Sequence, residues 1–230
     1  MKTIRFSGYD WTVKSSRDRV GPGSNYFSDS SENVWVDSRG RLHLRITKRG
    51  DRWYCAEVVS KRSFGYGTYR FHLAALPDEI DPKVVLGLFT WNNEPAYHHR
   101  EIDVELSHWG EPDTQLGQFV VQPYTDPKNI SRFPVPLPLP ASTQSFTWTP
   151  SKVTFLSTKR SAAASSGPDA VIHKWTATNG IPRAGGENAR MNLWLMREPG
   201  QDEDRQTEVI IDRFAFEPSR DQPAKPRLEG

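Results

Sequence analysis

Short runs in which apolar and polar residues alternate recur along this chain from residue 33 to residue 217. A period of two places successive side chains on opposite faces of an extended chain, and Gly, Pro, Asn, Asp and Ser residues bound the runs, as is typical of strands separated by turns. The runs predict strands at residues 33–37, 42–48, 54–60, 67–73, 84–91, 101–107, 117–123, 145–149, 153–157, 171–177, 191–196 and 208–217. We find neither the period of an amphipathic helix nor a repeat of fixed length. The sequence therefore predicts an all-β fold, an antiparallel β-sandwich, and disfavours a propeller or solenoid.

Length and local composition predict one domain with a short tail. A chain of 230 residues can bury a substantial core in a single unit, which we place at residues 1–220. Prolines alternate at residues 134–140, and because each lacks an amide donor, we expect a loop there rather than a paired strand. Residues 161–169 have the composition of a flexible surface loop, and residues 221–230 that of a disordered C-terminal tail.

Charge and hydropathy exclude several classes of partner. Thirty Lys and Arg residues against 28 Asp and Glu residues leave a formal charge of +2, which predicts no nucleic-acid partner. The longest apolar runs, such as residues 84–89, are far shorter than the roughly 20 residues needed to cross a bilayer, so we expect no membrane partner. A single cysteine, Cys55, excludes an intramolecular disulfide and any site that needs two thiolates. No signal-peptide pattern opens the chain.

The segment HHREIDVELSHWG, residues 98–110, carries the strongest chemical pattern. In a strand, Glu101, Asp103 and Glu105 project from one face. If that face is exposed to solvent, three acids are simply tolerated there. If it lines a cleft, burial and mutual repulsion raise at least one carboxyl pKa and keep that group protonated near neutral pH.

A protonated and an ionised carboxyl group together suit glycoside hydrolysis with retention, which needs a proton donor and a nucleophile about 5 to 5.5 Å apart. The Cα atoms of strand residues four apart are separated by roughly 13 Å, so the two carboxyl groups converge only on a bent, concave sheet.

The motif EIDVE resembles the catalytic strand of glycoside hydrolase family 16, E-[ILV]-D-x-E, which includes lichenases and laminarinases. Three further segments are similar to that family in the same order: CAEVVSKRSFGYGTYRF at residues 55–71, SFTWTPSKVTFLS at 145–157 and IPRAGGENARMNLW at 181–194. The resemblance spans most of the chain. It implies a concanavalin A-like jelly roll of two curved sheets with a substrate cleft on the concave side.

The resemblance also implies the reaction and the catalytic roles. Glu101 is the expected nucleophile, Asp103 the assisting acid and Glu105 the general acid/base. The implied activity is endo-acting, retaining hydrolysis of a β-linked polysaccharide of the β-glucan or β-galactan type, with no cofactor required for catalysis. Family members often have Trp two residues before the nucleophile, where this chain has His99. A transglycosylase uses the same residues and remains an alternative.

Sugar rings stack on aromatic side chains, and their hydroxyl groups need fixed polar partners. The chain has eight Trp, seven Tyr and eleven Phe residues, a heavy aromatic load for a mean hydropathy of -0.68. The predicted substrate-binding residues are Glu57, which matches a sugar-binding Glu of the family, and Trp91, Tyr97, His99, Trp109, Gln122, Tyr124, Trp148 and Trp194. Asn33 and Arg100 are weaker candidates for the same role.

Two metal hypotheses accompany this interpretation. The histidines and acids of residues 98–108 suggest a cupin-like transition-metal site, but ligands along one strand splay apart and the H-x-H spacing is absent. The family resemblance implies a structural calcium ion, with Asp212 and the carbonyl group of Gly40 as candidate ligands. Calcium takes six to eight oxygen ligands, so two candidates do not make a complete site.

A non-catalytic, lectin-like glycan-binding module is the main alternative, because the same architecture serves both functions. For the enzyme, the expected partner is a polysaccharide substrate and the expected state a monomer. A polymer substrate cannot enter a cell, so we expect a secreted or periplasmic protein.

Overall fold

The computed structural model describes residues 1–76, 79–111, 115–160, 169–197 and 206–220. Within these ranges the chain forms sixteen strands and two single-turn 3-10 helices, η1 (His98–Arg100) and η2 (Pro127–Asn129). None of the described helices has the length and apolar character needed to cross a bilayer.

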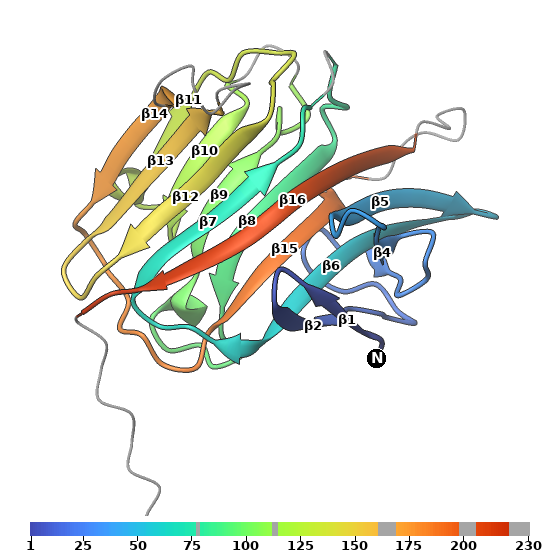
Figure 1. Ribbon diagram of the computed structural model, residues 1–230, viewed down its shortest axis with the longest axis horizontal. Helices are drawn as coiled ribbons and strands as arrows, with labels where there is room; N and C mark the ends of the chain where they lie inside the picture. Colours follow the sequence, from blue (N-terminus) through green and yellow to red (C-terminus); the bar gives the residue numbers. More distant parts are fainter. Residues whose placement is uncertain (77–78, 112–114, 161–168, 198–205, 221–230) are drawn as a thin grey trace, which may run out of the picture.

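Two curved sheets lie face to face, and in Figure 1 the strands β16, β7 and β12 pass in front of β8, β9 and β10. The first sheet has the order β11-β10-β9-β8-β15-β6, with bounds Ile130–Phe133, Gly117–Val121, Ile102–Leu106, Val84–Trp91, Asn188–Leu195 and Arg52–Ser63. The second has the order β5-β16-β7-β12-β13-β14, with bounds Leu42–Arg49, Thr207–Pro218, Gly67–Leu73, Ser142–Trp148, Val153–Lys159 and Ala170–Ala177.

Shorter strands extend this framework. Strand β2 (Tyr9–Val13) pairs with β6 and with β1 (Thr3–Phe6), β4 (Val34–Val36) pairs with β5, and β3 (Tyr26–Phe27) pairs with β6 in parallel. Strands β5 and β6 also pair with each other, so one hydrogen-bonded hairpin joins the two sheets. The predicted antiparallel β-sandwich of two curved sheets is therefore confirmed.

All twelve predicted strands are present, and the proline run at residues 134–140 lies outside the strands, as predicted. The sequence analysis missed β1, β2, β3 and β11, which are two to five residues long and too short to show a clear alternation. The expected loop at 161–169, except residue 169, and the expected tail at 221–230 lie outside the described residues.

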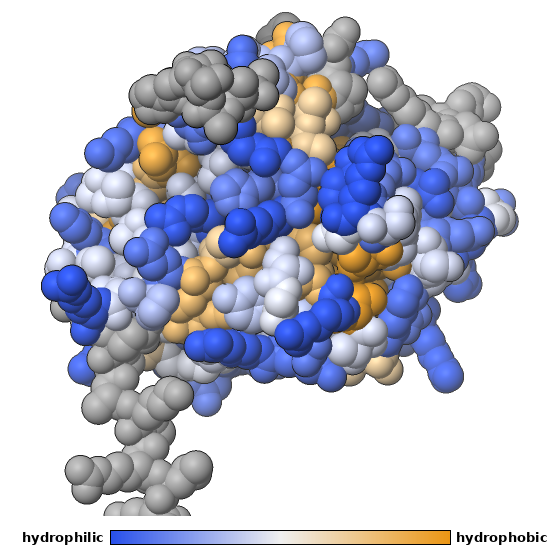
Figure 2. Space-filling view, in the orientation of Figure 1, coloured by the Kyte–Doolittle hydropathy of each residue, from blue (hydrophilic) through white to orange (hydrophobic). Residues whose placement is uncertain are grey.

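The core lies between the facing surfaces of the two sheets, where aromatic rings pack across the interface. Phe119 of β10 stacks on Phe155 of β13 with ring centroids 4.9 Å apart, and it also contacts Phe133 of β11 at 4.5 Å. All three side chains are almost completely buried. Figure 2 shows the outer face of the second sheet as mainly hydrophilic, with a band of apolar residues across its middle. The apolar side chains of each strand thus face the core. The outward-facing side chains of the first sheet are not needed for the core and can form a functional site.

We expect Phe119→Ala to lower the free energy of unfolding by about 3 to 5 kcal/mol, because it removes a ring that bridges the sheets and leaves a cavity. Urea unfolding monitored by circular dichroism measures the change. Val171→Ala in β14, where the side chain is 62% exposed, is the matched control and is expected to change the same quantity by about 0.5 kcal/mol or less. Equal effects of the two changes would contradict this account of the core.

Candidate active site

Strand register places polar side chains in rows on the outward face of the first sheet. One row crosses four neighbouring strands, and each residue in it is paired with the next: Glu105 of β9, Gly87 of β8, Asn192 of β15 and Glu57 of β6. In the next row Asp103 lies opposite Phe89, which lies opposite Arg190. Gly87 makes the first row possible, because a Cβ atom there would lie 2.4 Å from the side-chain oxygen of Asn192.

These rows line a cavity of about 280 Å³. The lining residues are Lys14, Gly21, Pro22, Glu57, Gly87, Phe89, Trp91, Glu101, Asp103, Glu105, Arg190, Asn192 and Trp194. All three acids of the EIDVE motif are among them, and Asp103 is only 4% exposed. The acids therefore share a cavity and do not lie on a freely solvated sheet face.

Two glutamines bind two of the acids. Gln118 lies in the neighbouring strand β10, and Gln122 directly follows that strand. Gln118 donates to Glu105 Oε2 at 2.8 Å, and its own carbonyl oxygen accepts from Arg132 Nε at 2.8 Å. Gln122 donates to Asp103 Oδ2 at 3.1 Å. Each of these acids consequently has a defined partner, and the side chains are fixed before any ligand enters.

Burial raises the pKa of all three carboxyl groups, and repulsion among them adds to this for Glu101 and Asp103. A hydrogen bond between Asp103 and Glu101 lowers the pKa of Glu101 and raises that of Asp103, which makes Asp103 the proton donor of the pair. Arg190 also lowers the pKa of Glu101. Because three acids in one desolvated site cannot all ionise, the trio retains protons near neutral pH.

Glu57 lies at the far side of the same cavity and is 1% exposed. Its Oε2 atom pairs with Lys14 Nζ at 2.8 Å, and its Oε1 atom pairs with Arg190 Nη1 at 3.2 Å. Two cations therefore compensate one buried carboxylate, which satisfies the usual condition for burying such a charge.

Four successive residues before β9 have left-handed backbone conformations: Tyr97, His98, His99 and Arg100, with φ of 55°, 50°, 63° and 54°. Each costs an L-residue roughly 1 to 2 kcal/mol, so the surrounding contacts must impose this turn. Arg100 Nε donates to the carbonyl oxygen of Arg183 at 3.0 Å, and the Arg100 carbonyl oxygen accepts from Thr90 Oγ1 at 2.8 Å. The turn ends at Glu101 and therefore sets where that carboxyl group enters the cavity.

His99 is held within this turn against the cavity wall. Its ring stacks on Trp91, with centroids 4.1 Å apart and an interplanar angle of 7°, and its Nδ1 atom lies 2.9 Å from the carbonyl oxygen of Asn92. The residue that departs from the family pattern thus supports Trp91, which itself lines the cavity.

The structure brings only part of the predicted sugar-binding set together. Glu57, Trp91 and Trp194 line the cavity. His99 and Gln122 contact cavity residues without lining the cavity themselves.

Three other candidates lie away from the cavity lining. Tyr97 and Tyr124 are 47% and 62% exposed. Trp109 follows β9 at the end opposite Glu101, where its indole N–H is buried without a hydrogen-bond partner among the described residues.

Trp148 was expected to contact substrate, and this prediction is wrong. The side chain is completely buried, packs edge-on against Tyr66 and donates to the carbonyl oxygen of Pro182 at 3.2 Å. Asn33 is likewise a core residue, whose amide donates to the carbonyl oxygen of Arg45 at 2.9 Å and to that of Tyr54 at 3.0 Å. Arg100 braces the left-handed turn and is 8% exposed.

Sequence analysis also missed cavity residues, notably Lys14, Arg190 and Asn192, and it missed the Glu105 partner Gln118. Three of these had a visible signal. Arg190 and Asn192 lie within the matched segment at residues 181–194, and Gln118 lies four residues before Gln122 in one predicted strand, hence on the same face. Lys14 had none, because it lies 87 positions before Glu101 and meets the site only through the fold.

The metal hypotheses find little support in the side-chain arrangement. No group of three or more His, Cys, Asp or Glu side chains able to hold a metal ion occurs in the part of the chain that the structure describes. Asp212 lies at an irregularity of β16, where its carboxylate is paired with the guanidinium group of Arg160. Arg160 Nη2 also donates to the carbonyl oxygen of Leu73 at 2.9 Å. A cation already occupies the Asp212 carboxylate, so Asp212 as arranged does not fit a calcium ligand.

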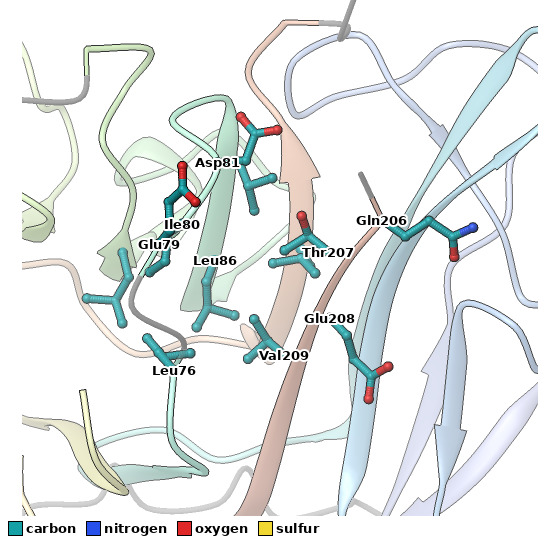
Figure 3. A pocket seen from close by; sticks show the side chains of 12 residues that line it. Leu76, Glu79, Ile80, Asp81, Leu86, Gln206, Thr207, Glu208 and Val209 are labelled. Atoms are coloured by element: carbon teal, nitrogen blue, oxygen red, sulfur yellow. The ribbon is translucent and has the colours of Figure 1, made fainter. Parts of the chain in front are cut away.

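A second cavity, of about 110 Å³, opens at the edge of the core. Figure 3 shows apolar side chains such as Leu76, Leu86 and Val209 lining it, with the carboxylates of Glu79 and Asp81 nearby. Leu86 belongs to the core-facing set of β8, and none of the three EIDVE acids lines this cavity. The cavity with the acids is therefore the candidate active site.

We expect His98→Gly to raise the free energy of unfolding by about 0.5 to 1 kcal/mol, because glycine adopts a positive φ without strain and this outweighs its greater freedom in the unfolded chain. His98 is exposed, so little packing is lost. Urea unfolding measures the difference, with His98→Val as the opposing variant, expected to be less stable than the wild type. A His98→Gly protein less stable than His98→Val would contradict the strained turn.

We expect the melting temperature to be the same in EDTA and in excess calcium, because Arg160 supplies the positive charge at Asp212. A calcium ion present at one hundred times its dissociation constant would stabilise the protein by about 2.7 kcal/mol, which thermal unfolding would detect. Magnesium is the control for non-specific ion effects. A rise in melting temperature with calcium alone would show that a calcium site exists.

Several solved structures match this chain over about 90% of its length. No protein-family model and no curated protein sequence matches the chain. Among solved structures, a β-glucanase of Bacillus licheniformis matches with a TM-score of 0.65 and 21% identity, over 91% of this chain and 92% of that one. A prokaryotic β-1,3-1,4-glucanase (lichenase) from a mouse hindgut metagenome matches with a TM-score of 0.62 and 20% identity, over 91% and 93%.

A protein of Mycobacterium tuberculosis, described as an immunostimulatory antigen and pseudo β-1,3-glucanase, matches with a TM-score of 0.62 and 21% identity, over 90% of this chain and 91% of that one. The likeness in each case extends over nearly the whole of both chains. The chain therefore has the β-sandwich jelly-roll fold of these glucanase structures, as its resemblance to glycoside hydrolase family 16 predicts.

Proposed function

We propose that this protein is a retaining, endo-acting glycoside hydrolase that cleaves a β-linked glucan. The observation that carries the proposal is the position of Glu101, Asp103 and Glu105 in one cavity, with Gln122 bound to Asp103 and Gln118 bound to Glu105. The β-glucanase structures of the same fold support β-glucan as the substrate class. A β-galactan remains the alternative backbone.

In the first step, the Glu101 carboxylate attacks the anomeric carbon while Glu105 gives its proton to the glycosidic oxygen. The bond between the anomeric carbon and the carboxylate oxygen forms, and the glycosidic carbon–oxygen bond breaks, so the sugar chain beyond it leaves with the proton. In the second step, Glu105 takes a proton from water, the water oxygen attacks the anomeric carbon, and Glu101 is released as a carboxylate.

The pKa of Glu101 is raised to about 8 and that of Glu105 to about 7, so the assignment of nucleophile and proton donor rests on the family resemblance and on hydrogen bonding, not on the order of the two values. Asp103 donates a hydrogen bond to Glu101, and such a bond stabilises the ionised nucleophile and the returning carboxylate in the second step. Burial raises the pKa of Glu105 and so favours the protonated form that the first step consumes.

The remaining lining residues have the chemistry of a sugar site. The indole rings of Trp91 and Trp194 offer apolar faces for stacking, and Glu57, Lys14 and Asn192 offer acceptors and donors for hydroxyl groups. We place the activity outside the cytoplasm, in a secreted or periplasmic setting, because a glucan polymer does not enter the cell, and we propose that the protein acts as a monomer without a catalytic cofactor.

We expect Glu101→Gln to reduce hydrolysis of the best glucan substrate by roughly 10³-fold or more, because the amide cannot act as the nucleophile. Reducing-sugar release from lichenan, laminarin, xyloglucan, agarose and carrageenan identifies the substrate and measures the loss. Proton NMR of the first product formed by the wild type should show the β-anomer, as retention requires. Glucan affinity of the variant, measured by calorimetry, should remain close to that of the wild type.

Other outcomes decide between the alternatives. Undiminished cleavage by the variant, or an α-anomer as first product, would remove this mechanism. A wild type that binds glucan and cleaves none of these polymers would be a lectin-like module, a reading to which the pseudo-glucanase neighbour gives weight. Products longer than the starting oligosaccharide would identify a transglycosylase.

A further inference from the structure

Lys14 directly follows strand β2 and lines the cavity beside Glu57. Its backbone N–H donates to the carbonyl oxygen of Glu57 at 2.9 Å, and its side chain is 23% exposed. The Nζ atom donates to Glu57 Oε2 at 2.8 Å and to the carbonyl oxygen of Gly21 at 2.7 Å, and it lies 4.0 Å from the centre of the Phe27 ring. One ammonium group thus connects strand β6, strand β3 and the loop that contains Gly21.

That loop, residues 20–25, is closed by its own hydrogen bonds. Val20 and Asn25 exchange two backbone hydrogen bonds, of 2.8 and 2.9 Å, and the Asn25 side chain donates to the carbonyl oxygen of Pro22 at 2.8 Å. Gly21 and Pro22 line the cavity. The 20–25 loop therefore presents these two residues to the cavity as one unit, and its position depends on what holds it to the sheet.

The 20–25 loop also rests on strand β15. Asn25 Nδ2 donates to the carbonyl oxygen of Leu195 at 2.8 Å. A Cβ atom on Gly23 would lie 2.6 Å from that oxygen and 2.7 Å from the Cζ3 atom of Trp194, and Gly23 has a φ of 67°, which glycine adopts without strain. The backbone of the loop therefore lies directly against the indole ring of Trp194, which itself lines the cavity.

Neutralising Glu57 does not by itself account for Lys14. Arg190 Nη1 pairs with the Oε1 atom of Glu57 at 3.2 Å, so two cations contact one buried carboxylate. One paired cation meets the usual condition for burying such a charge. Lys14 is the cation that also holds the carbonyl oxygen of Gly21, so its placement is explained by anchoring the loop as well as by pairing with Glu57.

The anchored loop lies at the far end of the row of residues that begins at Glu105. From Glu105 on β9 to Glu57 on β6 this row crosses three steps between strands, which is roughly 14 Å at the usual strand spacing. Lys14 follows β2, the next strand beyond β6. A glucan that runs along this row away from the acids therefore reaches the 20–25 loop and Trp194 with its most distant sugar unit.

We propose that Lys14 is a positioning residue for substrate binding: it fixes the 20–25 loop against Trp194, so that the loop and the indole ring together bind the sugar unit farthest from the acids. This inference rests on the proposed glycosidase function of the same site. It names the segment that determines how long a glucan chain the cavity recognises.

The test measures the affinity of lichenan and laminarin oligosaccharides of increasing length by calorimetry. Glu101→Gln is the background, because it is expected not to cleave them, and it is compared with the double variant that also carries Lys14→Met. We expect the affinity gained from the sugar unit that reaches the loop to fall by about tenfold, while shorter oligosaccharides bind as in the background. An equal loss at every length, or no loss at any length, would overturn the proposal.

A second variant displaces the loop without removing a charge. Gly23→Ala places a Cβ atom against Leu195 and Trp194, so we expect the same length-dependent loss, also if Lys14→Met does not fold. Gly8→Ala is the matched control, because Gly8 has a φ of 82° in the turn between β1 and β2 and a Cβ atom there would meet nothing within 4 Å. Lys61→Met, at an exposed position of β6, controls for the loss of a lysine. A loss in Gly8→Ala as large as that in Gly23→Ala would contradict the role of the loop.

Hydrogen–deuterium exchange separates this proposal from the proposed function, because it needs no substrate. We expect the backbone amides of Val20 and Asn25 to exchange about tenfold faster in Lys14→Met than in the wild type, and at the wild-type rate in Lys61→Met. Unchanged exchange in Lys14→Met would overturn the anchoring role. A wild type that binds the oligosaccharides with the expected length dependence and cleaves no glucan would overturn only the proposed function.

Discussion

The packing of the two sheets against each other is the interaction on which the rest of this structure depends. Because strand residues alternate between faces, burying one face of the first sheet against the second leaves the side chains of its other face to line the cavity. Rings such as Phe119 and Phe155 fill the interface. Their burial supplies favourable free energy of folding, which offsets the cost of desolvating the acids and cations on the opposite face.

That opposite face carries several charges that would be unfavourable if each were alone. Three of the carboxyl groups have specific neutralising or hydrogen-bonding partners: Lys14 and Arg190 at Glu57, Gln122 at Asp103 and Gln118 at Glu105. The left-handed turn before Glu101 adds a backbone cost of the same kind. The strained backbone of the turn and the desolvated charges of the cavity therefore lie at the same site, as is common at catalytic sites.

Sequence reasoning predicts the framework better than the site, for a physical reason. The alternation of apolar and polar residues is visible in consecutive positions of the sequence. Every long strand and the shared face of Glu101, Asp103 and Glu105 could therefore be predicted. The roles of tryptophans could not, because burial depends on which layer faces each ring. Trp148 belongs to the core, whereas Trp194 lines the cavity, although both lie in strands with similar patterns. Ion pairs between distant segments, such as Lys14 with Glu57, leave no local pattern at all.

The strand order also bears on how the chain is made. Strand β15 lies between β6 and β8, and β16 lies between β5 and β7, so the two described strands that come last in the sequence occupy interior positions, one in each sheet. A nascent chain on the ribosome therefore presents incomplete sheets with open edges until β15 and β16 emerge. Such edges are prone to pairing with other chains, and long-range pairing of this kind is slow. Completion of this sandwich thus waits until β15 and β16 have been synthesised and can insert to close both gaps.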